Sequence, residues 1–542
     1  MRVLVVGAGP AGLTTAVTIA RYGVPVLLVE RRADTTSLPR ATAVSTRTME
    51  LFRSWGIEER VRAAGPDVSW QARVARNLTA PDGVVADIGF PTREQALAVS
   101  PTWPACVPQD ALEEVLLEHL RGFPNVRVHQ ATEVTDLHDG PGGPGGTVLA
   151  RLRDRRTDVS RIVAAAYVVG ADGPRSVVRD AAGIGTEGPG VLADYSSTMF
   201  HAPLWEHLGE RRHGIYPLTD PAVSGVLLPA GGDRWVYGRE TDGRDGTVDL
   251  LRAATGVADL RPRITREARF TFTVRLAQRY RTGRMFLAGD AAHQITPRGG
   301  TGMNTAIHDG HDLGWKLAWV LLGWAGPQLL DTYETERRPV GLRNAARSAQ
   351  PDGSYRAAAG ELANDLGGRL PHAWLDRDGT PVSTLDLLGP RSTLLVGPRY
   401  TGSVTAGDAP PGRGDGRPAR RGAGRRAAAA PRRPARRRAG STSPGGRRRE
   451  PSALAAGSAC GWRRPGRHTA PAARRAGCGR RSAAPTGRSR AARPAGRTAR
   501  AHLRRCRTGR ASGPRPGTER RAWRRRTSRR RTPTGTSGRP AR

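Results

Sequence analysis

The chain has 542 residues and a formal net charge of +39, and nearly all of this charge lies at its C-terminal end. Residues 411–542 hold 41 Arg and three acidic residues, a net of +38, so the 410 residues before them carry 46 basic and 45 acidic groups. Because these 410 residues are nearly neutral, their net charge does not indicate what kind of ligand they bind. The length of the chain allows two or three domains with a large core.

Cysteine usage limits the chemistry of these residues. Cys106 is the only cysteine before residue 411, and Cys460, Cys478 and Cys506 follow it without metal-ligand spacing. No His/Cys/carboxylate cluster in the sequence has the spacing of a metal site, and no CxxC pair indicates a disulfide reductase. We therefore expect a reducing compartment and no metal.

The N-terminus predicts a strand, a glycine turn, a helix and a second strand. An apolar run over Arg2–Val6 leads into GAGPAG at residues 7–12, and Val26–Val29 then ends in Glu30. In this context the glycines form a dinucleotide fingerprint: the first makes the tight turn, the second lets the backbone reach a pyrophosphate, and the third permits close helix packing. We expect Glu30 to bind a ribose hydroxyl; its alternative is a surface acid at a strand end. The uncharged run Val3–Ala20 resembles a signal peptide, but the fingerprint favours a cytoplasmic protein.

Two later stretches also predict a strand that ends at an Asp-Gly or Gly-Asp pair. Tyr167–Arg179 reads YVVGADGPRSVVR, and Arg284–Lys316 reads RMFLAGDAAHQITPRGGTGMNTAIHDGHDLGWK. In the second stretch a strand over Met285–Ala288 precedes a Pro/Gly loop and a helix that begins near Met303. Glycines let the backbone approach a ligand, and a helix start offers unpaired N–H groups and a positive dipole end. Such a site suits the negative edge of a reduced flavin.

In this order, the three motifs resemble those of the FAD-dependent aromatic hydroxylases, the single-component flavoprotein monooxygenases that include the polyketide hydroxylases. Segments within Pro39–Gly56, Pro91–Glu113 and Leu329–Val340 extend the resemblance, which covers the chain to about residue 400. One departure is Thr301, where many members of the family carry Gln. Because this loop acts mainly through its backbone, we expect Thr301 to alter flavin positioning or substrate preference without abolishing FAD binding.

The resemblance implies an α/β fold: a dinucleotide-binding FAD domain with a β-rich substrate domain inserted. It implies FAD as the cofactor and NADPH or NADH as a transient reductant. It also implies hydroxylation of an aromatic substrate, a polyketide or another phenolic, by O2 through a C4a-hydroperoxyflavin. The flavin carries this chemistry, so we expect no catalytic side chain. The expected partners are a small aromatic molecule and O2, without a membrane.

The resemblance also implies cofactor contacts. Arg40 would contact the FAD phosphates, Gln109 the ribityl chain and Asp290 a ribityl hydroxyl. The alternatives are a solvated loop arginine for Arg40 and a helix-capping amide for Gln109. His293, in the same motif as Asp290, stays outside the predicted set.

The second motif would serve both FAD and the nicotinamide through Asp172, with Arg179 as a phosphate contact. Asp172 could instead only cap the next helix. Arg31 would lie near a 2′-phosphate if the first site bound NADP, but the resemblance assigns that site to FAD. The predicted cofactor-binding residues are Gly7, Gly9, Gly12, Glu30, Arg31, Arg40, Gln109, Asp172, Arg179, Asp290, Pro297, Gly302, Met303 and Asn304.

Residues 182–275 predict the substrate domain. Four runs, YSSTMFHAPLW, VSGVLLPA, DRWVYGRE and ARFTFTVRLA, are typical of strands, and the last alternates most clearly. We expect a mostly antiparallel sheet above the flavin ring. Each candidate pocket residue has core packing as its favoured alternative. The candidates for substrate contact are Phe200, Tyr216, Trp235 and Tyr237, together with His201.

The predicted domains are 1–180 with 276–350 for FAD, 181–275 for substrate, and 351–410 as a helical segment with the remnant of a thioredoxin-like domain. Residues 411–542 contain no Val, Ile, Phe, Tyr, Met, Asn or Lys. Such a tail cannot bury enough apolar surface to offset the entropy of ordering, so we expect it to be disordered. We favour an out-of-frame reading of a GC-rich gene as its origin over a nucleic-acid-binding arm.

The sequence leaves two other functions open. A flavin oxidoreductase without oxygen insertion would carry the same three motifs. The chain could also be the inactive product of a frame-shifted gene.

Overall fold

The structure is a computed structural model, and it describes residues 2–34, 41–140, 146–240, 248–353, 355–390 and 393. The predicted tail and Arg40 lie outside the described residues, and the described residues belong to one compact unit. Within them, no helix is long and apolar enough to cross a membrane.

A six-stranded sheet forms the first layer of the fold. Five neighbouring strands are parallel, and the sixth pairs antiparallel at one edge. Four of the parallel strands are buried along their whole length, which explains their continuous apolar sequence. In sheet order the strands are β17 (Arg281–Thr282), β18 (Met285–Leu287), β11 (Tyr167–Gly170), β1 (Val3–Val6), β2 (Val26–Val29) and β7 (Val126–His129).

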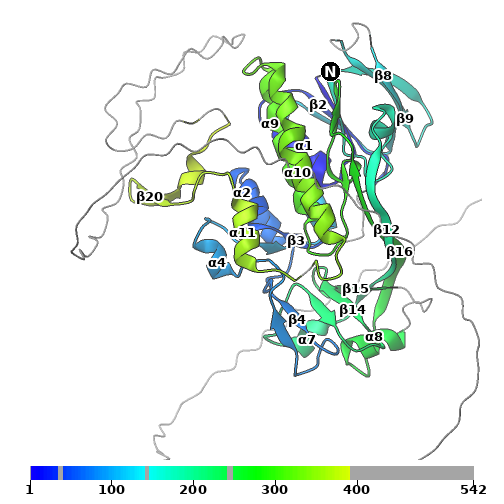
Figure 1. Ribbon diagram of the computed structural model, residues 1–542, viewed down its shortest axis with the longest axis vertical. Coiled ribbons are helices and arrows are strands. Elements are labelled where there is room, and N and C mark those ends of the chain that lie inside the picture. Colours follow the sequence, from blue (N-terminus) through cyan, green and yellow to red (C-terminus); the bar gives the residue numbers. More distant parts are fainter. Residues whose placement is uncertain are drawn as a thin grey trace, which may run out of the picture. The chain divides into compact units, whose positions relative to one another are not determined.

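Four helices accompany this sheet: α1 (Pro10–Ala20), α5 (Gln109–Arg121), α9 (Gly302–Leu321) and α10 (Asp331–Ser348). Helix α1 packs against both α5 and α9. Helix α10 packs against α9, and Figure 1 shows the two side by side. Glycine makes the α1–α9 crossing close, since a Cβ at Gly310 would lie 2.4 Å from the Ala11 carbonyl oxygen. A larger residue at this position would push the two helices apart.

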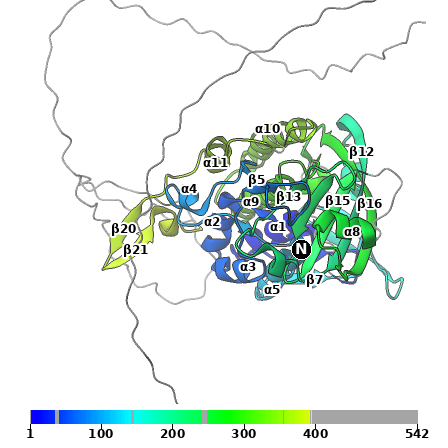
Figure 2. The ribbon, with the colours of Figure 1, turned by 90° about the horizontal axis from the view of Figure 1, so that it is seen from below.

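The second six-stranded sheet is antiparallel, and two long strands, β12 (Thr186–His201) and β16 (Arg263–Ala277), pair along it. Figures 1 and 2 show both strands running along one side of the described structure. Bulges interrupt their register three times. In sheet order the other strands are β13 (Tyr216–Leu218), β14 (Gly225–Pro229), β15 (Arg234–Glu240), then β12 and β16, and β19 (His293–Gln294).

Smaller elements complete the fold. A three-stranded sheet contains β8 (Thr132–Asp139), β9 (Val148–Asp154) and β10 (Ser160–Ala165), and three two-stranded pairs are β3 (Ala43–Val44) with β6 (Ala105–Cys106), β4 (Ala72–Val74) with β5 (Val84–Ala86), and β20 (Trp374–Arg377) with β21 (Thr380–Ser383). The remaining helices are α2 (Thr46–Ser54), α3 (Glu58–Ala63), α4 (Arg93–Leu97), α6 (Val177–Ala181), α7 (Leu204–Leu208), α8 (Val248–Thr255) and α11 (Ala358–Leu366), with 3-10 turns η2 (Gly289–Ala291), η3 (Pro327–Leu330) and η4 (Thr384–Leu387).

The architecture confirms the expected α/β fold with a β-rich insert, and the four predicted strand runs fall on β12, β14, β15 and β16. The sequence pattern did not indicate α7 and α8, two short helices that pack their apolar residues against the second sheet. The domain boundaries stay predictions.

Candidate functional site

The glycine turn after β1 is tight because its neighbours leave no room for side chains. Gly7 has φ +104°, and a Cβ there would lie 2.3 Å from the Ala171 carbonyl oxygen. A Cβ at Gly12 would lie 1.9 Å from the Gly7 carbonyl oxygen, so the first turn of α1 rests directly on the loop. In contrast, a Cβ at Gly9 would meet no atom within 4 Å. The turn therefore has an open side at Gly9, where a ligand can approach the backbone.

Glu30 lies beside this turn at the end of β2. Its Oε2 accepts a hydrogen bond from the Ala8 backbone N–H at 2.8 Å, and its Oε1 accepts one from the Arg32 N–H at 3.0 Å. The side chain is buried enough to be held in place, and the neighbouring Arg31 is exposed. The carboxylate is thus fixed at the rim of the glycine turn.

The Asp-Gly loop after β11 caps its own helix. Asp172 accepts hydrogen bonds from the Ser176 hydroxyl (2.5 Å) and the Val178 N–H (3.2 Å), and burial raises the pKa of Asp172. This is the capping alternative considered for Asp172, and it does not test the flavin role. The Arg179 guanidinium donates to the carbonyls of Pro174 (3.0 Å) and Ala291 (3.3 Å), so it ties this loop to the Gly-Asp turn after β18.

Asp309, on the second turn of α9, holds the Gly-Asp turn in place through hydrogen bonds. Its buried carboxylate accepts from the Gly289 N–H at 3.2 Å, and His293 Nε2 lies 2.6 Å away. The Arg337 Nε of α10 donates to the other oxygen at 2.8 Å. Burial raises the pKa of Asp309, but the charges of Arg337 and His293 outweigh burial and leave this pKa below its usual value. Asp290, the residue after Gly289 in this turn, is exposed.

The loop before α9 leads into the start of the helix through two glycines. Gly299 and Gly300 have φ +84° and +61°, and Pro297 before them is exposed. Helix geometry leaves the N–H groups of the first helical residues, Gly302 to Asn304, without an acceptor inside the helix. These donors are the groups expected to face a ligand.

Two of the predicted cofactor-binding residues have structural partners for their side chains. The Asn304 amide oxygen accepts from the Ser45 N–H (2.8 Å), and its nitrogen donates to the Ala43 carbonyl (2.9 Å), so Asn304 fastens β3 and α2 to α9. At the start of α5, the Gln109 side chain donates to Glu113 at 2.7 Å. The sequence pattern indicated neither partner.

The three motifs meet at one edge of the first sheet. Val6 pairs with Gly170, and Gly170 pairs with Leu287, so β1, β11 and β18 end side by side and their loops are neighbours. The carboxyl edge of a parallel sheet is where α/β folds bind ligands. Residues far apart in the sequence thus form one cradle with an open glycine, a fixed carboxylate and free helix N–H groups.

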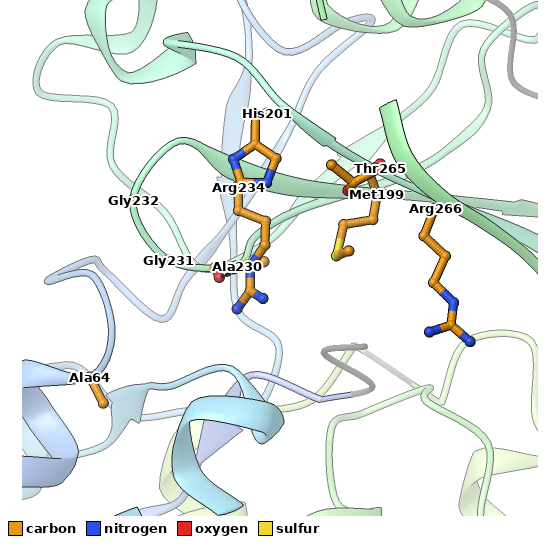
Figure 3. Close-up of a pocket in the computed structure, with 9 residues that line it drawn as sticks. All are labelled: Ala64, Met199, His201, Ala230, Gly231, Gly232, Arg234, Thr265 and Arg266. Atoms are coloured by element: carbon orange, nitrogen blue, oxygen red, sulfur yellow. Dashed lines mark hydrogen bonds between the residues drawn. The ribbon is translucent and has the colours of Figure 1, made fainter. Parts of the chain in front are cut away.

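A cavity of about 660 Å³ lies beside the second sheet (Figure 3). The side chains of Met199, Arg234 and Arg266 extend into it from the sheet. Arg234 is held by a bidentate ion pair with Asp110 of α5, at 2.6 and 3.1 Å. Burial first, and then the charges of Arg263 and Arg234, lower the pKa of His201. The cavity is lined by Ala64, Met199, His201, Ala230, Gly231, Gly232, Arg234, Thr265 and Arg266.

The four aromatic candidates for substrate contact lie elsewhere. Phe200 pairs with Trp235 and Thr198 with Tyr237, on the sheet face opposite to Met199 and His201. All four are buried in the hydrophobic core that includes α7 and α8, and the hydroxyls of Tyr216 and Tyr237 donate to backbone carbonyls. This is the favoured packing alternative. Among the candidates only His201 lines the cavity, and substrate contact by the other four stays a prediction that their burial does not favour.

The family of the chain follows from its similarity to known proteins. Residues 1–348 match the family described as the FAD binding domain. The chain belongs to this FAD-binding family. It is similar to the tetracenomycin A2 monooxygenase-dioxygenase of Streptomyces glaucescens, with 36% identity over 467 residues that cover 73% of this chain and 82% of that protein. It is also similar to aklavinone 12-hydroxylase of Streptomyces peucetius, with 34% identity over 452 residues, 73% of this chain and 91% of that one.

Among solved structures, the aklavinone-11 hydroxylase in a ternary complex with FAD and aklavinone has a TM-score of 0.63 and 31% identity, covering 72% of this chain and 82% of that one. Together with the family match, these relatives confirm the predicted class: this member of the FAD-binding family is an FAD-dependent aromatic monooxygenase. The cradle fits the cofactor, because it offers an open backbone at Gly9 for a pyrophosphate and unpaired N–H groups at α9 for an anionic ring edge.

Proposed function

We propose that this FAD-dependent monooxygenase hydroxylates a polycyclic aromatic of the polyketide type, with NADPH or NADH as the reductant and O2 as the oxygen donor. The observation that supports this most is the joining of the three motif loops at one sheet edge, with the second sheet and its cavity in the same compact unit. The names of the relatives, which act on tetracenomycin A2 and aklavinone, favour a polycyclic ring system.

The predicted contacts give each part of the cradle a task. Gly9 and the first turn of α1 would hold the pyrophosphate, and Glu30 would bind the adenosine ribose. Asp290 would bind the ribityl chain. It is positioned for this because Asp309 holds the same turn through the Gly289 N–H. The N–H groups from Gly302 to Asn304 would stabilise negative charge on the ring edge.

When bound, the flavin supplies hydride acceptance and oxygen activation. The chain's own residues position the ring and exclude water. The face of the second sheet that lines the cavity would cover the aromatic substrate. No described side chain is needed to abstract a proton.

The first test is the visible absorbance of the purified full-length chain, followed by stoichiometry. We expect bound oxidised flavin without added cofactor, and then one NAD(P)H and one O2 consumed for each hydroxylated product when a polycyclic phenol is supplied. NAD(P)H oxidation that yields no hydroxylated product would indicate an oxidoreductase without oxygen insertion. A colourless chain that becomes yellow once a frame-corrected C-terminus is supplied would show that the tail has inactivated the enzyme.

A further inference from the structure

The inner face of β16 is defined by its alternating sequence. Between residues 266 and 276 its register with β12 is regular on the β16 side, so the even-numbered residues share one face and the polar odd-numbered residues share the other. The even face is turned toward the cradle. Leu276 packs beside Gly341 of α10, and the guanidinium carbon of Arg298, the residue after Pro297, lies 5.3 Å from the Phe272 ring centroid.

This inner face is aromatic next to the cradle. Tyr195 stacks on Phe272 with ring centroids 3.7 Å apart and planes within 5°. Phe270 is the direct partner of Tyr195 and is 38% exposed. A partly exposed aromatic ring on a face turned toward the cradle offers flat apolar area on which an aromatic ligand can stack.

Farther along the same face the side chains are first small and then basic. Ser197 pairs with Ala268, and Met199 pairs with Arg266, which borders a bulge at Thr265 and extends into the cavity (Figure 3). From Tyr195 to His201 the strand covers roughly 20 Å at 3.3 Å per residue. That length accommodates several fused rings in a line.

At the basic end, one arginine has no acidic partner among the residues that the structure describes. Asp110 neutralises Arg234, whereas Arg266 makes no ion pair with any described residue. None of the residues that line the cavity is acidic. A guanidinium in such surroundings favours a carboxylate or an ionised phenol, which it can bind through two parallel hydrogen bonds.

We propose that the substrate is an elongated, acidic polycyclic aromatic, with its anionic group at Arg266 and its opposite ring on Tyr195 and Phe270, next to the Phe272 ring that Arg298 contacts. This assignment rests on the proposed function and adds the substrate's charge and direction. Arg266 and Phe270 are then specificity-determining residues, and the ring farthest from the anionic group is the one that is hydroxylated.

The test uses the full-length flavin-containing protein and two binding probes, anthraquinone-2-carboxylate and its neutral carboxamide. We expect the carboxylate to bind about tenfold or more tightly than the carboxamide, as a charge-assisted hydrogen bond would give. Arg266→Gln should remove this preference and raise KM for an acidic substrate with little change in kcat. The control is Arg275→Gln, an exposed arginine on the polar face of the same strand, which should keep the preference.

Equal binding of the two probes to the unaltered protein, absence of binding by both, or a preference that survives in Arg266→Gln would overturn the proposal. Flavin absorbance and thermal stability of each variant separate a folding defect from a lost anion site; if Arg266→Gln does not fold, Arg266→Lys should retain part of the preference. Coupled hydroxylation without a charge preference would reject this inference alone, whereas a protein without flavin would reject the proposed function.

Discussion

Gly12→Ala is expected to abolish flavin binding and to destabilise the chain by about 3 kcal/mol or more. The added Cβ would lie 1.9 Å from the Gly7 carbonyl oxygen, a backbone atom that cannot rotate away, and Ala171 closes the other side at 3.3 Å. Relief therefore requires α1 to move off the glycine turn, which would also disturb its close crossing with α9. Flavin content after purification and the free energy of unfolding in urea measure the two effects.

The matched control is Gly9→Ala, three residues earlier in the same turn. Gly9 has φ −78°, which alanine adopts readily, and its Cβ would meet no protein atom within 4 Å. We expect the flavin-free protein to keep its stability but to bind FAD at least tenfold more weakly, if the pyrophosphate approaches this backbone. A stable, yellow Gly12→Ala protein would contradict the packing argument, and unchanged FAD affinity in Gly9→Ala would contradict the cofactor assignment.

The sequence could predict the cradle because its signals are local. The runs at Val3–Val6, Val26–Val29 and Tyr167–Gly170 are apolar throughout since these strands are buried on both faces, and each is followed by a glycine or an acidic residue within two positions. Parallel strands present their loops at one edge, so the motifs had to meet once the strands were neighbours.

The substrate side could not be predicted in the same way, because it depends on register. Phe200 and Phe270 are both aromatic residues on predicted strands, yet one faces the core and the other faces the cradle. Bulges between Glu187 and Gly190 and between Val191 and Ala193 shift β12 against β16, and nothing local in the sequence marks them. The alternation in ARFTFTVRLA did hold the signal that Phe270 and Phe272 share one face.

Asp309 was missed for a related reason. Its partners come from three other elements, at Gly289, His293 and Arg337, so the sequence alone shows only an acidic residue on a helix. A buried carboxylate becomes recognisable as a positioning residue when its donors are known.

Breaking the Asp309–Arg337 pair should have the second large effect. Asp309→Ala leaves a largely buried guanidinium without its carboxylate and frees the Gly289 N–H, so we expect a loss of about 3–5 kcal/mol in the free energy of unfolding. The variant Asp309→Ala/Arg337→Met removes both charges and should recover part of this loss. As a control, Asp249→Ala breaks an exposed pair with Arg252 and should cost less than about 1 kcal/mol.

The pH dependence gives an independent check on the same pair. Because the pKa of Asp309 is lowered in the folded protein, its contribution to stability is complete above the unfolded-state pKa of about 4 and is lost as pH falls through the folded-state value. The stability difference between the unaltered protein and Asp309→Ala should therefore be constant near neutral pH and shrink in acid. The carboxylate would act by packing rather than by charge if this stability difference were the same at every pH. The same conclusion would follow if the stability lost in the double variant equalled the sum of the losses in the two single variants. FAD affinity should fall in Asp309→Ala and stay low in the double variant, since neither variant restores the acceptor for the Gly289 N–H.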